Sequence, residues 1–149
     1  MGDDLPRRGP TGPAGAFSIQ VLVDADNVTG PRLNALLAAL RDVPARIVAA
    51  GARESLRAVS WPGGALLFPR KGWQRADVAL ADAYTPTPGP LVIVSGDGDF
   101  SLLAARHPGP VLVVSEAASG RLRAVAPIVD PIQDGVGPLT AWVRVVMDR

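Results

Sequence analysis

The stretch Leu91-Val92-Ile93-Val94 runs directly into Ser95-Gly96-Asp97-Gly98-Asp99-Phe100, and these ten residues are the most informative part of the sequence. A short aliphatic run bounded by glycine is typical of a buried parallel strand. The carboxylates of Asp97 and Asp99 therefore follow the end of a strand. An earlier stretch is built the same way, because Val21-Leu22-Val23 leads into Asp24-Ala25-Asp26-Asn27. The sequence thus predicts two buried strands that both end in acidic residues.

Strand-like and helix-like segments alternate along most of the chain. The predicted strands are residues 18–23, 46–50, 65–68, 91–94 and 111–114, with a possible short edge strand at 128–129. The predicted helices are residues 33–40, 53–59, 76–84, 100–106, 119–125 and 138–147. Such alternation implies right-handed βαβ crossovers. We therefore expect a three-layer α/β fold with a parallel sheet of about five strands.

The chain is expected to form one domain preceded by an arm. Residues 1–16 are rich in glycine, proline and charge, which predicts a disordered N-terminal arm. Residues 17–149 have the length of a single domain, and the 48% hydrophobic content supplies a core. There is no apolar leader at the start, and no apolar run approaches the ~20 residues of a membrane helix. A cytoplasmic protein without membrane association is expected.

Composition excludes several kinds of chemistry. The 149 residues include no cysteine, which removes disulfides, thiolate metal sites and thiol nucleophiles. The single histidine, His107, makes a histidine metal cage or a Ser-His-Asp triad improbable. His107 falls near the end of a predicted helix, where we expect a capping or surface residue.

The two acidic strand ends indicate a divalent-metal site. Ligands of open α/β sheets bind outside the carboxyl ends of the strands, near the point where strand order reverses. If Asp24 and Asp97 converge there from adjacent strands, their carboxylates need a cation between them. Mg²⁺ and Mn²⁺ prefer oxygen ligands and usually keep several waters, so a few carboxylates suffice.

Further acids lie near these strand ends, each with two interpretations. Asp99 is either an N-cap of the following helix or a residue facing the cleft. Asp77, in the first turn of the 76–84 helix, either complements the helix dipole or joins the metal site. Asp82 lies about 140° around that helix from Asp77, so it either supports the site or pairs with an arginine. Asp26 projects differently from Asp24, and Asn27 either caps the loop or orients a ligand carboxylate.

Three motifs in order, followed by a late strand at 111–115 that runs into Ser119 and a helix with Leu122, resemble the NYN domains of the PIN-like nuclease superfamily, over residues 17 to about 130. They are Val23-Asp24-Ala25-Asp26-Asn27, then Lys71-Gly72 leading to Ala76-Asp77-Val78-Ala79-Leu80-Ala81-Asp82-Ala83, and Ser95-Gly96-Asp97-Gly98-Asp99-Phe100. The third motif is fairly specific for that group, whereas Asp24 and Asn27 are a weak signal alone. The family commonly places Lys-Gly almost against the helix aspartate. Here four residues intervene, so Arg75 is a plausible substitute for Lys71.

The resemblance implies a Rossmann-like sheet, one or two Mg²⁺ or Mn²⁺ ions, and hydrolysis of RNA phosphodiester bonds. It also implies that the metal ligands, and hence the catalytic residues, are Asp24, Asp77, Asp97 and Asp99. The residues expected to support them are Asn27, Asp26, Asp82 and Ser95. PIN-like domains often dimerise, so a homodimer is possible.

A basic loop beside the site predicts contacts with single-stranded RNA. Arg70, Lys71 and Arg75 flank Trp73, and phosphate contacts combined with base stacking are the usual single-strand arrangement. Alternatively, Trp73 packs over the sheet edge. The net charge is only +1, but setting aside the six aspartates near the site leaves fifteen basic residues against eight acids. That excess either attracts a polyanion or is ordinary solvated surface.

Two other functions remain open. The stretch Val23-Asp24-Ala25-Asp26-Asn27-Val28 resembles the nucleophile loop of haloacid-dehalogenase-like phosphatases, in which Asp24 would attack phosphorus and Asp26 would act as acid/base. That assignment leaves Asp77 without a role. Small nucleotide triphosphates are further possible substrates of the same metal chemistry. The third interpretation is a PIN-like module that binds RNA or a protein partner without turnover.

Overall fold

The computed structural model describes residues 18–71 and 75–148, so the predicted N-terminal arm lies outside the described residues. Six parallel strands form one sheet: β1 (Ile19–Asp24), β2 (Ala45–Gly51), β3 (Leu66–Pro69), β4 (Leu91–Val94), β5 (Val111–Val114) and β6 (Ile128–Val129). The predicted parallel sheet is confirmed, and the short segment 128–129 adds a sixth strand to the five expected.

The spatial order of the strands is β3-β2-β1-β4-β5-β6. The chain builds outward from β1 to β3, then crosses back to place β4 on the other side of β1. Because the order reverses there, the crevice between the carboxyl ends of β1 and β4 is the topological switch point of the sheet. Residue Val23 of β1 is directly paired with Val94 of β4, which brings the two acidic strand ends side by side.

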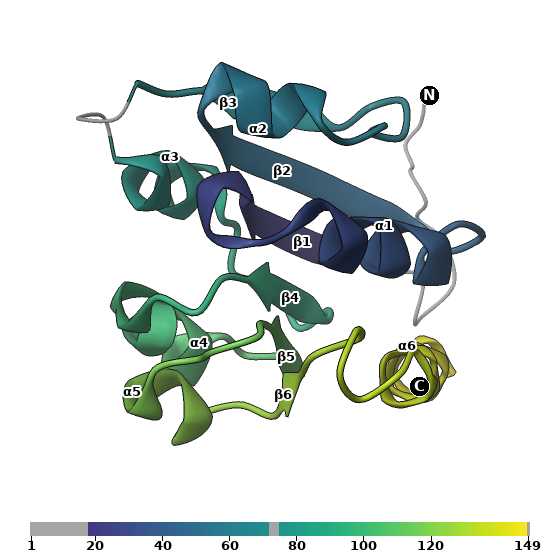
Figure 1. The fold of residues 1–149 in the computed structure, drawn as a ribbon. Coiled ribbons are helices and arrows are strands. Elements are labelled where there is room, and N and C mark those ends of the chain that lie inside the picture. The colour runs from purple at the N-terminus through teal and green to yellow at the C-terminus, as the bar shows by residue number, and fades with distance from the viewer. Residues whose placement is uncertain (1–17, 72–74, 149) are drawn as a thin grey trace, which may run out of the picture.

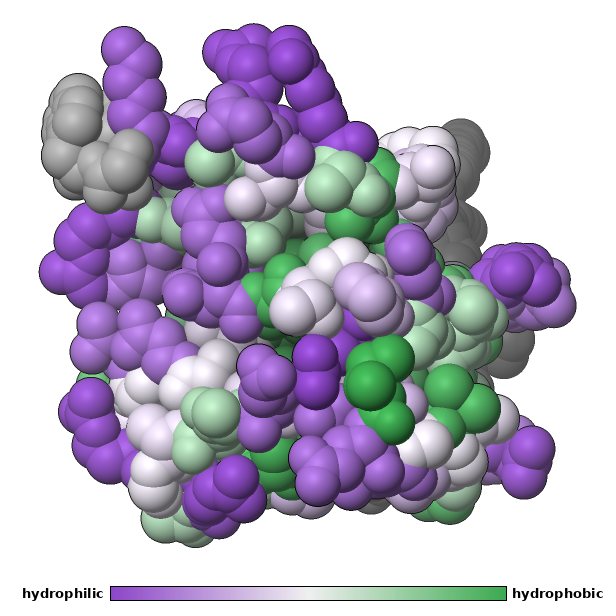
Figure 2. All heavy atoms as spheres, in the orientation of Figure 1, coloured by the Kyte–Doolittle hydropathy of each residue, from purple (hydrophilic) through white to green (hydrophobic). Residues whose placement is uncertain are grey.

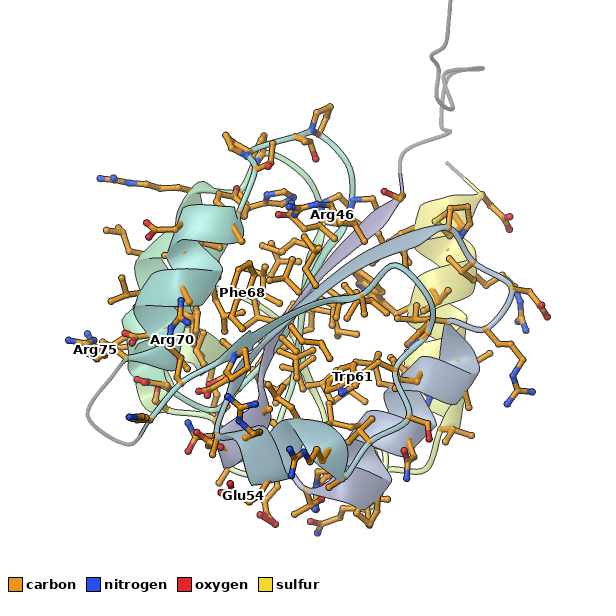
Figure 3. All side chains as sticks on the ribbon, turned by 90° about the horizontal axis from the view of Figure 1, so that it is seen from above. Arg46, Glu54, Trp61, Phe68, Arg70 and Arg75 are labelled. Atoms are coloured by element: carbon orange, nitrogen blue, oxygen red, sulfur yellow. The ribbon has the colours of Figure 1, made fainter. Side chains whose placement is uncertain are left out.

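Helices cover both faces of the sheet (Figures 1 and 3). They are α1 (Gly30–Ala39), α2 (Arg53–Arg57), α3 (Ala76–Ala83), α4 (Ser101–Arg106), α5 (Gly120–Arg123) and α6 (Gly137–Met147), with 3₁₀ turns η2 (Ala25–Asn27) and η3 (Gly98–Phe100). One core cluster joins α1, α2 and α6 to the sheet, and a second joins α3, α4 and α5 to its other face. The three layers expected from the sequence are confirmed.

Successive side chains of β1 point to opposite faces of the sheet, so this one strand contributes to both core clusters. Val21 and Val23 pack in the cluster under α1 and α6, whereas Leu22 packs under α3 and α4. All six residues of the strand are buried, as in a parallel sheet covered on both faces. Asp24 has the same parity as Leu22 and ends the strand as a buried carboxylate.

The apolar stripes of the long helices are also confirmed. Leu33 and Leu36 of α1, and Leu139, Val143 and Val146 of α6, are buried on the same core cluster. Pro31 lies in the first turn of α1, where its missing N–H has no intrahelical partner to lose. On the face shown in Figure 2, exposed apolar residues are interrupted by hydrophilic ones.

The prediction for His107 is half right. The residue does cap the end of α4, since its N–H donates to the Leu103 carbonyl. Its side chain, however, is buried rather than at the surface, with Nδ1 2.7 Å from the Tyr84 hydroxyl and Nε2 2.7 Å from the Gly89 carbonyl. These contacts fasten the proline-rich loop before β4. The position next to Pro108-Gly109 gave no sign of this tertiary role.

No helix in the described part of the chain combines the length and the hydrophobicity that a membrane span requires.

Candidate metal centre

Three carboxylates gather at the carboxyl edge of the sheet. One ligand oxygen from each of Asp77, Asp97 and Asp99 lies within 4.8 Å of the other two. Asp77 comes from the first turn of α3, whereas Asp97 and Asp99 come from the turn after β4. Asp77 is twenty residues from Asp97 in the chain, so only the fold brings the helix and the strand end together. The group therefore combines two of the three motifs quoted above.

The turn after β4 is held by its own side chains. Asp97 is the N-cap of η3, and its Oδ1 accepts a hydrogen bond of 2.9 Å from the Asp99 N–H. The capping role predicted as one possibility for Asp99 thus belongs to Asp97. Asp99 instead lies in the first turn and is exposed, with its carboxylate open to solvent and to neighbouring arginines. Asp99 is one of the three carboxylates of the group.

Asp24 is linked to this group through a short hydrogen-bond network. The buried Ser95 hydroxyl donates to Asp24 Oδ2 at 3.0 Å and accepts from the Asp97 N–H at 3.1 Å. The Asn27 amide donates to the same Oδ2 at 2.6 Å. Oδ1 of Asp24 accepts no hydrogen bond from residues 18–71 or 75–148. Asn27 therefore orients a carboxylate, one of its two predicted roles, and Ser95 connects both acidic strand ends.

Burial raises the pKa of Asp24, and the two hydrogen bonds from Asn27 and Ser95 only partly oppose that effect. The nearby charges of Asp26 and Asp97 raise it further. A buried carboxylate with like charges beside it is a group that gains from a cation. Its position at the switch point adds a geometric reason to expect a ligand there.

Arg75 is the cation that this structure places against the acids. Its guanidinium donates to both oxygens of Asp77 and, through Nη2, to Asp99 Oδ2 at 3.1 Å. The hydrogen bond from Arg75 holds the pKa of Asp77 below its usual range. Arg121 lies farther off, with Nη2 3.7 Å from Asp99 Oδ1. The acidic group thus attracts positive charge from two separate elements.

The donor set fits Mg²⁺ or Mn²⁺. Hard divalent cations take oxygen ligands, and Asp77, Asp97 and Asp99 provide carboxylate oxygens on one side while solvent can complete the coordination. Two oxygens on one Mg²⁺ lie at most about 4.2 Å apart, given bonds near 2.1 Å. The observed limit of 4.8 Å requires only small side-chain movements. An ion placed there would take over the role of the Arg75 guanidinium as counter-charge.

Two acids predicted to support the site lie elsewhere. Both carboxylate oxygens of Asp26 accept from the Ala52 N–H, at 2.9 and 3.1 Å, which ties the turn after β1 to the start of α2. Gly51 makes room for this contact, since a Cβ there would lie 3.0 Å from Asp26 Oδ1. Asp82 is exposed on α3 and is not part of the carboxylate group, as its helical angle from Asp77 suggested.

The predicted basic loop is only partly visible. Arg70 follows β3 and is half-buried, with its guanidinium 5.7 Å from the Phe68 ring centre and donating to the Pro69 carbonyl. Figure 3 shows Arg70 and Arg75 on the side of the sheet that α3 covers. Lys71 is exposed, and Trp73 lies outside the described residues.

The sequence predicted the strand at 111–114, but no site residue was expected at its end. Ser115 and Glu116 follow that strand as Ser95 and Asp97 follow β4, and they line a hollow of about 300 Å³ together with Asn27, Gly96, Asp97 and Ala117. Glu116 is ion-paired with Arg32, whose guanidinium also holds Asp130 at the end of β6. The repeated pattern of an aliphatic strand followed by Ser and an acid is the signal that could have identified them.

Comparisons with known proteins support the fold and do not extend to function. No family model matches the sequence, and no curated protein matches it. A crystal structure of a protein of unknown function from Vibrio parahaemolyticus resembles this one with a TM-score of 0.53 and 23% sequence identity. The match covers 80% of this chain and 97% of that chain. At this identity the likeness concerns the α/β architecture alone.

Proposed function

We propose that this protein is a metal-dependent ribonuclease of the NYN, PIN-like type that hydrolyses RNA phosphodiester bonds. The observation that carries the proposal is the meeting of Asp77, Asp97 and Asp99 within 4.8 Å at the switch point, with Asp24 joined to them through Ser95. These four aspartates come from β1, α3 and the turn after β4. The order of the motifs in the sequence favours all four residues. The spatial grouping supports three of them directly, and Asp24 lies outside that group and is joined to it through Ser95.

In this proposal the four aspartates hold Mg²⁺ or Mn²⁺, and Asn27 and Ser95 keep Asp24 in place. The bound metal would supply a water of lowered pKa and would neutralise charge on the scissile phosphate. The protein itself would position the ion through its aspartates and would supply positive charge through Arg75. With a cation held by Asp77 and Asp99, the Arg75 guanidinium that now pairs with them would be available to a phosphate oxygen. Arg70, Lys71 and Trp73 would extend contact along single-stranded RNA.

The phosphatase alternative is less favoured because of Asp26. As an acid/base residue it would need its carboxylate beside the phosphate that Asp24 attacks. Both of its oxygens instead accept the Ala52 N–H at the start of α2. The non-catalytic alternative has no geometric feature in its favour, and the experiment below distinguishes it.

The test is cleavage of a fluorescently labelled single-stranded RNA by the wild type, by Asp97→Asn and by Asp42→Asn. Asp42 is an exposed acid at the opposite, amino edge of the sheet, so its variant makes the same charge change away from the site. We expect cleavage with Mg²⁺ or Mn²⁺, none with EDTA, and a loss of about 100-fold or more in Asp97→Asn, since a ligand worth roughly 3 kcal/mol costs that factor.

Asp42→Asn should cleave like the wild type. Equal residual activity in all three preparations would mean a contaminating nuclease, and no activity in the wild type with any divalent ion would overturn the proposal. Turnover of p-nitrophenyl phosphate with a phosphoaspartate trapped on Asp24 would support the phosphatase instead.

A further inference from the structure

The hollow between the ends of β1, β4 and β5 lies beside the three-carboxylate group and shares one residue with it. It is lined by Asn27, Gly96, Asp97, Ser115, Glu116 and Ala117 and has a volume of about 300 Å³, at the lower end of the range for small-ligand sites. Asp97 belongs to both places, since it lines the hollow and also lies in the three-carboxylate group. A ligand in the hollow would therefore lie directly beside a phosphate held at the metal.

The polar groups of the hollow select hydrogen-bond donors. Two carboxylates line it, those of Asp97 and Glu116, and they repel a phosphate while accepting hydrogen bonds from hydroxyl groups. Asn27 donates its amide to Asp24, which leaves its carbonyl oxygen as a further acceptor. Ser115 Oγ accepts the Ala117 N–H at 3.1 Å, and its hydroxyl hydrogen remains to be donated.

Glu116 is oriented although it is exposed. Its side chain is 60% accessible, and Oε2 lies 3.4 Å from Arg32 Nη2. That arginine is fixed in turn by Asp130, with hydrogen bonds of 3.0 and 2.9 Å, and by the Thr29 hydroxyl at 3.1 Å. The Glu116 carboxylate is thus held at the mouth of the hollow, and Oε1 is left for a ligand.

We propose that this hollow binds the ribose of the nucleotide that flanks the scissile phosphate, with Glu116 accepting a hydrogen bond from the 2′-hydroxyl. The inference rests on the proposed ribonuclease function and adds the origin of its preference for RNA over DNA. Every phosphate of RNA is bonded directly to a ribose, so a donor-selective hollow that shares Asp97 with the metal group has the required position. The 2′-hydroxyl is the group by which a protein distinguishes RNA from DNA at one site.

The experiment measures binding without turnover. The probes are UMP, dUMP and CMP, titrated with Mg²⁺ into the wild type, Glu116→Gln and Glu54→Gln, with affinities from calorimetry or NMR shifts. Glu54 is an exposed acid on α2, on the β2–β3 side of the molecule, and its variant provides the same change of charge (Figure 3).

We expect the wild type and Glu54→Gln to bind UMP about 10-fold more tightly than dUMP, as one hydrogen bond to a charged acceptor would give. In Glu116→Gln the ratio should fall to about 3-fold or less, because a neutral acceptor forms a weaker hydrogen bond. UMP and CMP should bind alike. Equal binding of UMP and dUMP by the wild type would overturn the proposal. So would an unchanged ratio of UMP to dUMP affinity in Glu116→Gln, or a wild type that discriminates UMP from CMP and not UMP from dUMP.

Cleavage assays with RNA and DNA, set beside these binding data, separate the ribose-site proposal from the nuclease proposal on which it rests. A protein that cleaves RNA and DNA at equal rates keeps the nuclease proposal and refutes the ribose site. A protein that cleaves neither and still prefers UMP to dUMP keeps the ribose site and refutes the nuclease proposal.

Discussion

At the scale of the residue, the acids of this protein differ in what neutralises them. Asp77 has a guanidinium on both oxygens, whereas Asp24 is buried and receives only neutral hydrogen bonds from Asn27 and Ser95. The pKa of Asp77 is lowered by Arg75, and that of Asp24 is raised by burial. The negative charge of Asp24 is thus destabilising, whereas that of Asp77 is stabilised by Arg75. A carboxylate kept at a cost to stability is the kind of residue that function retains.

Replacing Asp24 by Asn should stabilise the metal-free protein. The ionised form of Asp24 is less favourable in the folded state than in the unfolded chain, because its folded pKa is raised by burial. That penalty is absent below pH 3.8, the ordinary value, and is fully present above the raised pKa. Asp24→Asn removes the charge and keeps the size, so its Tm at neutral pH should exceed that of the wild type.

Scanning calorimetry in EDTA measures this difference, with Asp42→Asn as the control for a surface charge. The gain should disappear as the pH falls below 3.8. A lower Tm for Asp24→Asn at neutral pH would show that the hydrogen bonds from Asn27 and Ser95 outweigh the cost of burial.

The ion pair between Arg32 and Asp130 should have the opposite pH dependence. Its side chains are 13% and 9% exposed, and the hydrogen bond from Arg32 lowers the pKa of Asp130. A lowered folded pKa contributes stability above the ordinary value of 3.8, and this contribution is lost as the pH falls below it. Asp130→Asn removes the two charged hydrogen bonds of Arg32 and leaves that guanidinium with Glu116 and Thr29. At neutral pH the variant should therefore lose about 2 kcal/mol in free energy of unfolding.

Urea unfolding at neutral pH and again at pH 3 to 4 checks this prediction. The gap in free energy of unfolding between wild type and Asp130→Asn should narrow in acid. Asp130 then takes up a proton in the unfolded chain, whereas its lowered pKa keeps it ionised to lower pH in the folded protein. A gap that stays constant would mean that the loss comes from the backbone hydrogen bonds that Asp130 accepts from Ile132 and Gln133.

At the scale of the element, local pattern was sufficient to locate the strands and helices. The runs of aliphatic residues at 91–94 and 111–114 are strands with the predicted bounds, and α6 has the predicted apolar stripe. Which acid caps the turn after β4 was not decided by spacing, because Asp97 and Asp99 are both common cap residues. The contacts of His107 and Glu116 depend on neighbours far away in the chain, so a local pattern could draw attention to Glu116 but could not identify the partners of either residue.

Two glycines of the Ser95–Phe100 stretch are required by close approach. A Cβ on Gly96 would lie 2.6 Å from the Ala117 carbonyl oxygen and 2.9 Å from Ser115 Oγ. A Cβ on Gly98 would lie 2.8 Å from both Ser119 Oγ and Arg121 Nη2. The turn after β4 therefore packs directly against the loop after β5, and both walls of the hollow depend on this packing.

Gly96→Ala should lower the free energy of unfolding by about 1–3 kcal/mol, the usual cost of overpacking. Gly120→Ala is the matched control, because nothing lies within 4 Å of a Cβ there and alanine favours the first turn of α5. Chemical denaturation of both variants measures the difference. Equal stability of the two variants would show that the 115–117 loop yields without cost.

At the scale of the whole molecule, the strand order creates the site. The alternation of elements predicted a parallel sheet, but it did not distinguish the possible orders of the strands. The order β3-β2-β1-β4-β5-β6 makes β1 and β4 neighbours and places β5 beside β4. Asp24 and Asp97 could therefore be proposed together from their strand-end positions. The hollow at β5 could not be proposed, because its lining is known only once the order is known.

Binding of Mn²⁺ should stabilise the entire domain, because Asp77, Asp97 and Asp99 come together only in the folded chain. At a Mn²⁺ concentration 100 times its Kd, the folded state gains about 2.7 kcal/mol. For a chain of this length, Tm should rise by roughly 5–10 °C. Asp97→Asn should show little or no rise in differential scanning fluorimetry. An equal rise in the variant would place the ion elsewhere.

The turn before β2 lies at the amino edge of the sheet, away from the acids. Ile19 opens β1 at this edge, where its N–H donates to the Pro44 carbonyl of the turn, and Asp42 in the same turn is exposed. A fluorophore or tether attached at position 42 would consequently project from the back of the molecule. The protein could be immobilised on a sensor chip through this turn, and a dissolved oligonucleotide would still reach the aspartates on the opposite edge.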